Sequence, residues 1–242
     1  MKRFAKALVA IMLIAMTVFT IGCNKPEDEP TSGGDNGGGN DTHAYVDLGL
    51  PSGTLWATCN VGATTPEGYG DYFAWGETEP KTIYNWSTYK YCMGSSITMT
   101  KYCNDSNYGN NGFTDNLTTL LPEDDAATAN WGSGWCMPTL VQWKELYQNT
   151  TNTWTTQNGV NGRLFTANNG KSLFLPAAGF RMDELEGIGI FGSYWSNSLD
   201  RDYPYGAWVF ILGPEYCYMF GNSYDDIPRD RGLSTRAVRS AK

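Results

Sequence analysis

Few residues in this 242-residue chain could do covalent chemistry. The chain has one histidine, His43, and no C-x-x-C pair. A Ser-His-Asp triad, a Cys-His pair or a histidine-based metal site needs a histidine inside the folded part, and C-x-x-C pairs are typical of zinc sites. His43 follows the polar segment NKPEDEPTSGGDNGGGND (24–41), which cannot form a packed core. We therefore interpret His43 as a bystander and expect no catalytic residues and no metal ligands of these classes.

Acidic side chains are the remaining candidates for catalysis, because glycoside hydrolases use two carboxylates that face each other across a cleft. The neighbours that could supply such a pair are Glu77 with Glu79, Asp124 with Asp125, and Asp183 with Glu184 and Glu186. Spacing along a chain does not give the separation across a cleft. Asp124 and Asp125 are better explained by a helix that starts beside them, where negative charge is favourable. We expect a protein that is not an enzyme, and keep a carbohydrate-active enzyme with paired carboxylates as an alternative.

Oxygen-rich segments raise the question of a calcium site. Candidate ligands occur in NDSNYGNNGFTDN (104–116) and in a second acidic group formed by Asp225, Asp226 and Asp230. The first segment has Gly109 where a calcium-binding loop needs an acid or amide, and Asn110 where it needs glycine. We interpret it as a polar loop. We therefore expect no cofactor, with calcium as the one alternative left open.

Aromatic residues are the most informative excess, at 14% of the chain. Sugars often stack their apolar ring faces on Trp and Tyr, while nearby amides and acids bind the hydroxyl groups. The aromatics beside glycine- or Asn-rich loops are the candidate ligand-binding residues: Trp75, Trp86, Tyr89, Trp195, Tyr203 and Tyr205. The competing interpretation is that a helix-poor domain uses aromatics to fill its core and fix its loops. We favour that interpretation for Trp56, Trp135, Trp143 and Trp208.

The element that must position these loops is a helix that begins after Thr139. Thr139 and Gln142 have the spacing of a capping box, and Leu140, Trp143 and Tyr147 then form one apolar stripe. This stripe predicts a helix packed against a sheet. A second, short helix is predicted over 122–130, where a proline and three acids precede alanines.

Strands are predicted on both sides of these helices. Residues 54–61 alternate with a period of two, which predicts a strand with one apolar face. The segments 172–175 and 207–212 are apolar on both faces, as in buried strands, and a last short strand is expected over 233–238. Residues 81–113 lack periodicity and are predicted to be a long loop region. Cys92 and Cys103 are a candidate disulfide that would close this region.

The N-terminal segment predicts export and lipid anchoring. Lys2, Arg3 and Lys6 precede an apolar run that ends at Gly22-Cys23, as in a secretory signal. The sequence T-I-G-C resembles a bacterial lipobox. We expect residues 1–22 to be a lipoprotein signal peptide, Cys23 to be lipidated, residues 23–44 to be a flexible acidic and Gly-rich tether, and 45–242 to be one domain.

Charge and cysteine number constrain the partners. Without residues 1–22 the chain keeps 14 basic and 25 acidic residues, a net charge of −11. Such a charge argues against nucleic acid as a partner. Lipidation of Cys23 would leave five other cysteines, an odd number that permits a bond to another chain.

Seven blocks of the sequence together resemble the Fibrobacter succinogenes major paralogous domain family, which is abundant in surface lipoproteins of the Bacteroidetes. The blocks are VDLGLPSGTLWATCNVG (46–62), GDYFAWGETEPK (70–81), DDAATANWG (124–132), WCMPTLVQWKEL (135–146), NGKSLFLPAAGFR (169–181), GSYWSNS (192–198) and RGLSTRAVR (231–239). The resemblance covers nearly all of 45–242. It implies a mixed α+β, C-type-lectin-like domain with paired N- and C-terminal strands, one or two helices and long irregular loops. The family pattern usually has arginine at the position of Cys136. The glutamate-proline-asparagine motif of true C-type lectins is absent, so their calcium-dependent sugar binding is not carried over.

These observations lead to one leading hypothesis and two alternatives. We expect a lipoprotein of the outer membrane, anchored by its N-terminal lipid at the cell surface, whose domain binds a glycan or a surface protein without catalysis. One alternative is a structural or adhesive component that assembles with other surface proteins. The other is the carbohydrate-active enzyme described above.

Overall fold

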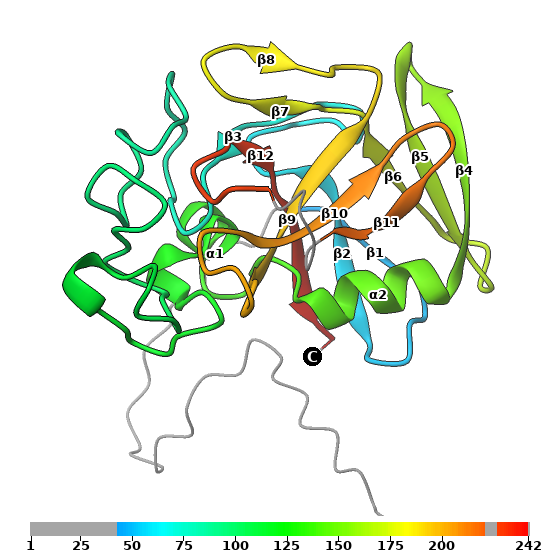
Figure 1. The fold of residues 1–242 in the computed structure, drawn as a ribbon. Helices are drawn as coiled ribbons and strands as arrows, with labels where there is room; N and C mark the ends of the chain where they lie inside the picture. The colour runs from blue at the N-terminus through cyan, green and yellow to red at the C-terminus, as the bar shows by residue number, and fades with distance from the viewer. Residues whose placement is uncertain (1–42, 221–226, 242) are drawn as a thin grey trace, which may run out of the picture.

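The computed structural model describes residues 43–220 and 227–241 and has a mixed α+β fold (Figure 1). The first sheet has the order β1-β2-β13 and is built from Tyr45–Asp47 (β1), Thr54–Asn60 (β2) and Arg236–Ser240 (β13). The second has the order β11-β10-β9-β12-β3 and is built from Cys217–Phe220 (β11), Ala207–Leu212 (β10), Gly192–Leu199 (β9), Leu233–Ser234 (β12) and Tyr72–Phe73 (β3). Within these two sheets only β12 and β9 pair in parallel.

A third sheet is an antiparallel meander of Thr150–Gln157 (β4), Val160–Ala167 (β5) and Ser172–Pro176 (β6). Phe180–Arg181 (β7) and Leu185–Glu186 (β8) form a separate short ribbon. The helical segments of the described chain are Ala126–Trp131 (α1), Leu140–Gln148 (α2) and the 3₁₀ turns Asn110–Gly112 (η1) and Pro122–Asp124 (η2). The expected mixed α+β class is confirmed at this level.

Helix α2 begins where the capping box predicted. The Thr139 side chain accepts a hydrogen bond from the Gln142 backbone N–H, and the Gln142 side chain accepts one from the Thr139 backbone N–H. Trp143 stacks on Phe210 of β10 with ring centroids 4.6 Å apart. The predicted packing against a sheet is therefore confirmed. The predicted stripe is wrong at one end, because Leu146 is buried and Tyr147 is 44% exposed.

The helix predicted over 122–130 is found as two pieces, the 3₁₀ turn η2 and the helix α1, and its two aspartates have different functions. Asp125 is its N-cap and accepts a hydrogen bond from the Thr128 backbone N–H. Asp124 is instead buried against the loop region, where it binds tyrosines and a lysine. Only one of the two carboxylates therefore stabilises the start of the helix.

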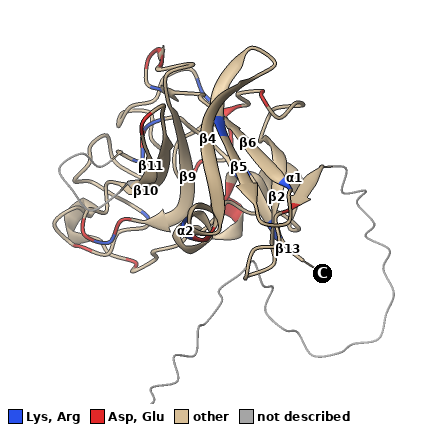
Figure 2. Cartoon of the chain, turned by 90° about the vertical axis from the view of Figure 1, so that its right-hand side faces the viewer, with Lys and Arg blue, Asp and Glu red and all other residues tan. Residues whose placement is uncertain are grey.

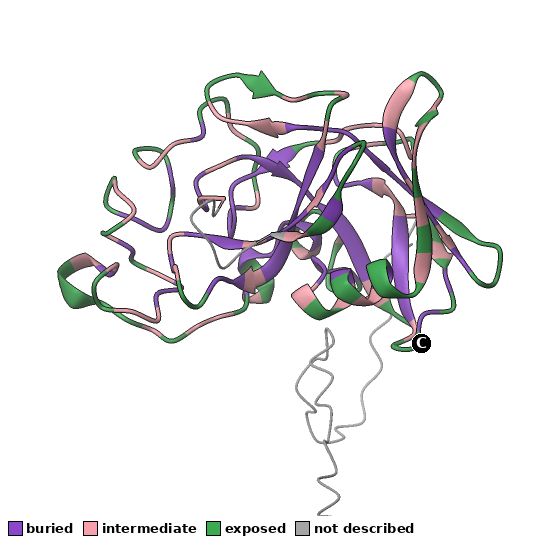
Figure 3. Cartoon of the chain, turned by 45° about the vertical axis from the view of Figure 1, so that its right-hand side comes forward, coloured by how far each residue is buried: buried purple, intermediate pink, exposed green. Residues whose placement is uncertain are grey.

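The strand predictions are confirmed in position and corrected in burial. Strand β10 has the predicted bounds, and the predicted final strand is split into β12 and β13. Strand β2 is buried on both faces at its centre, since Trp56 and Ala57 are both fully buried. It is the middle strand of its sheet, and Trp56 packs on Trp143 while Ala57 belongs to a second buried cluster. Figure 3 shows the buried residues concentrated in these central strands.

The loop region between β3 and α1 is fixed by buried side chains and not by the predicted disulfide. Cys92 and Cys103 are both buried free thiols, and each Sγ donates to a backbone carbonyl, of Trp86 and of Asp105, at 3.1 Å. Asp115 accepts hydrogen bonds from the backbone N–H groups of residues 102, 103 and 117. These hydrogen bonds hold the loops in a fixed conformation, so a disulfide is not needed to explain it.

The folded part begins slightly earlier than predicted. His43 stacks on Trp131 with ring centroids 3.9 Å apart, and the carbonyl of Ala44 accepts from the Thr58 N–H. His43 therefore belongs to the folded surface and not to the tether. The predicted signal peptide, Cys23 and almost all of the tether lie outside the described residues.

Charged residues are distributed over many separate segments. In Figure 2 the acidic and basic positions are short stretches separated by uncharged chain. Among the described residues, no helix combines the length and apolar character needed to cross a membrane.

Candidate functional site

Three of the six candidate ligand-binding aromatics are core residues. Trp75 and Trp195 are fully buried, and Tyr89 is 3% exposed. Their polar atoms bind protein carbonyls: Trp75 Nε1 donates to Ser196, Trp195 Nε1 to Phe73 and the Tyr89 hydroxyl to Trp75. The prediction that these three stack on a ligand is wrong. Aromatics with a polar atom are used here as links between loops and strands.

The other three candidates remain partly accessible but do not gather in one place. Trp86 is half-buried and meets Tyr89 edge to face at 5.7 Å. Tyr203 and Tyr205 are half-buried neighbours with ring centroids 5.9 Å apart, and Tyr205 also packs on Tyr108. The structure brings Tyr203 and Tyr205 together and leaves Trp86 with a separate cluster.

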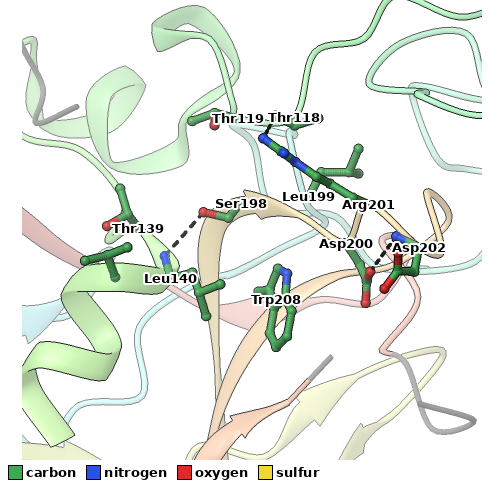
Figure 4. Close-up of a pocket in the computed structure, with 11 residues that line it drawn as sticks. Thr118, Thr119, Thr139, Leu140, Ser198, Leu199, Asp200, Arg201, Asp202 and Trp208 are labelled. Carbon is green, nitrogen blue, oxygen red and sulfur yellow. Dashed lines mark hydrogen bonds between the residues drawn. The ribbon is translucent and has the colours of Figure 1, made fainter. Parts of the chain in front are cut away.

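A surface hollow of about 400 Å³ lies at the start of α2 (Figure 4). Its lining comes from the 118–119 loop, the start of α2, the end of β9, the turn that follows it and the start of β10. The lining residues are Thr118, Thr119, Thr139, Leu140, Val141, Ser198, Leu199, Asp200, Arg201, Asp202 and Trp208. We call this the Trp208 hollow.

Trp208 supplies the aromatic surface of this hollow. It is the one half-buried residue among the first four of β10, where its neighbours Ala207 and Val209 are buried. Figure 4 shows its indole in the middle of the lining, with Leu140 on one side and Asp200 on the other. The Lys144 ammonium lies 5.6 Å from the centroid of the indole ring. The indole thus has a cation over its ring, from a lysine that is not itself part of the lining.

The polar side of the hollow is a short turn that contains two acids and an arginine. The Asp202 N–H donates to Asp200 Oδ1 at 3.0 Å, which fixes the turn in the manner typical of aspartate. Arg201 donates to the Thr118 hydroxyl at 3.2 Å. Asp200 is buried, whereas Arg201 and Asp202 are exposed. The exposed Asp202 carboxylate and Arg201 guanidinium therefore line the same hollow as the indole and can bind ligand hydroxyls, while the buried Asp200 holds the turn.

The hollow is held in shape by the end of β9. Backbone hydrogen bonds join Leu120 N–H to the Asn197 carbonyl and Asn197 N–H to the Pro138 carbonyl, so β9 ends between the 118–120 loop and the start of α2. The Leu140 N–H donates to Ser198 Oγ at 3.3 Å. Because these bonds link three separate segments, the lining is preformed rather than assembled from one loop.

The carboxylates predicted as catalytic pairs lie outside the Trp208 hollow. Glu79, Asp183, Glu184 and Glu186 are exposed, whereas Glu77 and Asp124 have protein partners. Glu77 forms an ion pair with Lys81 at 2.8 Å. Asp124 accepts from Lys101 and from the hydroxyls of Tyr91 and Tyr102. Burial alone raises the pKa of Asp124, but the hydrogen bonds from Lys101 and the two tyrosines outweigh it and hold the pKa below its usual range. This carboxylate is a structural anion.

The oxygen-rich segment 104–116 uses its acids within the protein. Asp115 binds backbone N–H groups, as described above, and Asp105 accepts from the Asn107 N–H. Within residues 43–220 and 227–241, no group of three or more His, Cys, Asp or Glu side chains is placed to hold a metal ion. Asp225 and Asp226 lie outside those residues.

Trp208 is the main site residue that the sequence pattern assigned to the core. AWVFIL (207–212) is apolar at every position, so periodicity does not tell which residue is accessible. The nearest signal is the turn-forming segment DRDYPYG (200–206) directly before it, which indicates a surface position at the start of the strand.

Searches with the sequence and the structure add no relatives to this description. Models of protein families, curated proteins and solved structures give no match to this chain.

Proposed function

We propose that this protein is a lipid-anchored lipoprotein of the outer membrane, exposed at the cell surface, whose lectin-like domain binds a glycan at the Trp208 hollow without catalysis. The observation that carries the proposal is the indole of Trp208 on the wall of a preformed hollow of about 400 Å³. A sugar ring has one apolar face that fits an indole, and its hydroxyls can bind the exposed Arg201 and Asp202.

The lectin-like fold is supported by two features. Strand β2, near the start of the domain, pairs with β13 at its end, as the resemblance to the Fibrobacter succinogenes major paralogous domain implies. The segment between β3 and α1 forms the long irregular loops that the same resemblance implies. The lipid anchor rests on the sequence around Cys23 alone.

Binding fits the hollow better than glycoside hydrolysis does. Its two carboxylates, Asp200 and Asp202, belong to one turn and are joined by a hydrogen bond through the Asp202 backbone. A hydrolytic pair instead faces the scissile bond from two sides. We therefore assign the exposed Asp202 to the recognition of hydroxyl groups and the buried Asp200 to holding the turn.

The test is a glycan array probed with the full chain in mild detergent, with calcium and with chelator. We expect specific binding that Trp208→Ala reduces about tenfold or more, since loss of an aromatic contact and its buried area exceeds about 1.4 kcal/mol. Trp86→Ala is the matched control, because Trp86 is also half-buried but does not line the hollow.

The outcomes separate the alternatives. An array without signal in either condition would remove the glycan proposal. Equal loss of binding in both variants would assign the effect to folding, which thermal melting of each variant checks independently. Loss of binding in chelator alone would make calcium part of the site.

A further inference from the structure

A second hollow lies farther along α2. It has a volume of about 280 Å³ and is lined by Lys144, Tyr147, Gln148, Tyr218 and Met219. These residues come from the last turns of α2 and from β11, the edge strand of the five-stranded sheet. Figure 1 shows α2 running beside β10 and β11, so the Trp208 hollow lies at the start of this helix and the second hollow at its end.

Lys144 connects the two hollows. Its side chain lines the second hollow, while its ammonium lies over the indole of Trp208 in the first. Val141 of the first hollow, Lys144, and Gln148 of the second are spaced three and four residues apart, so they share one side of the helix. At 1.5 Å per residue, Val141 and Gln148 are about 10 Å apart along the axis. The hollows are therefore consecutive parts of one surface.

The second hollow offers polar side chains that are not held by hydrogen bonds or ion pairs within the described residues. Among the described residues, the side chains of Lys144, Tyr147 and Gln148 make no hydrogen bond or ion pair to another protein group. The ring of Tyr147 is 44% exposed, so it presents an aromatic surface and a hydroxyl next to an amide and an ammonium. This combination again suits a pyranose ring with several hydroxyls.

We infer that the two hollows form one extended site for a linear oligosaccharide, with one sugar ring on Trp208 and following units along α2 over Tyr147. The inference rests on the proposed glycan binding and adds that the ligand is a chain of several sugars. Lys144 lies at the junction, where its ammonium donates hydrogen bonds to the ring on Trp208 or to the next unit.

The test measures affinity against chain length. The full chain is titrated calorimetrically with fragments of two, four and six units from cellulose, xylan, chitin and polygalacturonate. We expect the affinity for at least one series to rise with length. Tyr147→Ala should weaken binding of the hexasaccharide about three- to tenfold, the loss of one aromatic contact, and leave the disaccharide unchanged. Tyr45→Ala is the control, since Tyr45 is a 51% exposed tyrosine outside both hollows.

Failure of this inference is distinct from failure of the proposed function. Equal affinity for two and six units, or an equal effect of Tyr147→Ala at both lengths, would overturn the extended site and leave the Trp208 hollow in place. The extended site would also be overturned if the array showed binding of branched or single sugars while none of the four linear series bound. An array without any signal would overturn both.

Discussion

At the scale of single residues, buried arginines hold both loop and strand segments together. Arg229 is fully buried, donates to the Tyr102 carbonyl at 2.8 Å and lies 5.4 Å from the Trp75 ring centroid. Arg236, also fully buried, donates to Asn60 and to the Ala57 carbonyl. Such groups are retained only where hydrogen bonds replace the lost hydration.

Asp230 is the buried acid with the weakest compensation, and it predicts a pH effect. It is 1% exposed, its Oδ1 accepts no hydrogen bond among the described residues, and Arg231 Nε lies 3.8 Å away. Burial raises the pKa of Asp230 to about 6, above the roughly 3.9 of an unfolded aspartate. The folded state therefore binds the proton more tightly. Stability from this group is present below pH 4 and is lost as the pH rises through 6.

We expect Asp230→Asn to raise the Tm at pH 7.5 and to flatten the dependence of Tm on pH between 4.5 and 7.5. Thermal melting of the wild type and the variant across this range measures both effects. Asp183→Asn, which changes an exposed acid, should leave the slope unchanged. Parallel curves for wild type and Asp230→Asn would contradict the assignment.

At the scale of elements, the β4–β5 hairpin shows how a local turn sets a register. Asn158 and Gly159 connect the strands with φ of 48° and 83°, the positive values that a two-residue type I′ turn needs. The turn sets the pairing from Gln157–Val160 to Thr150–Ala167. The Asn-Gly pair is a hairpin signal in the sequence that our strand predictions did not use.

Gly159→Ala should destabilise the protein by about 1 kcal/mol, because a Cβ is unfavourable at positive φ. No atom lies within 4 Å of the added Cβ, so the cost comes from the backbone and not from a clash. Chemical denaturation measures it. Gly134→Ala is the control, since its Cβ also meets open space but its φ is not positive, and we expect a change within about 0.5 kcal/mol. Equal losses in the two variants would argue against the turn.

At the scale of the whole molecule, the long loops between β3 and α1 are packed as a second part of the core. Met99, Tyr102 and Cys103 of this region are fully buried in the same cluster as Trp75 and Trp195. The polar network of Asp115, Asp124 and Arg229 replaces the regular hydrogen bonds of strands. We therefore expect the region to unfold together with the rest of the domain.

Thiol labelling checks this account. In the native protein we expect slow alkylation of Cys92, Cys103 and Cys217, because they are buried and burial raises the pKa of each thiol, for Cys217 to about 12. Cys59, which is half-buried, should react faster. After denaturation without reductant all four should be alkylated, as mass mapping of peptides would show. A Cys92–Cys103 peptide pair that stays linked would restore the predicted disulfide.

The sequence by itself determined the local elements of this protein. The capping box of Thr139 and Gln142 predicted the start of α2, because its hydrogen bonds lie within one segment. The continuous apolar run 207–212 predicted the bounds of β10. The expected α+β class came from the resemblance of seven sequence blocks to a known family, and the structure confirms it at that level. The absence of hydrophobic periodicity in residues 81–113 also distinguished this loop region from the regular strands.

Only the tertiary structure decided which aromatics and acids are accessible. Trp195 and Trp208 are both strand tryptophans, and their sequence neighbours do not show which one is accessible. In the structure β9 is covered on both faces, while the start of β10 borders a hollow. Asp124 and Asp125 are adjacent, yet one binds the loops and the other caps a helix. Burial depends on which distant segments pack against a residue, and that packing is set by the whole chain.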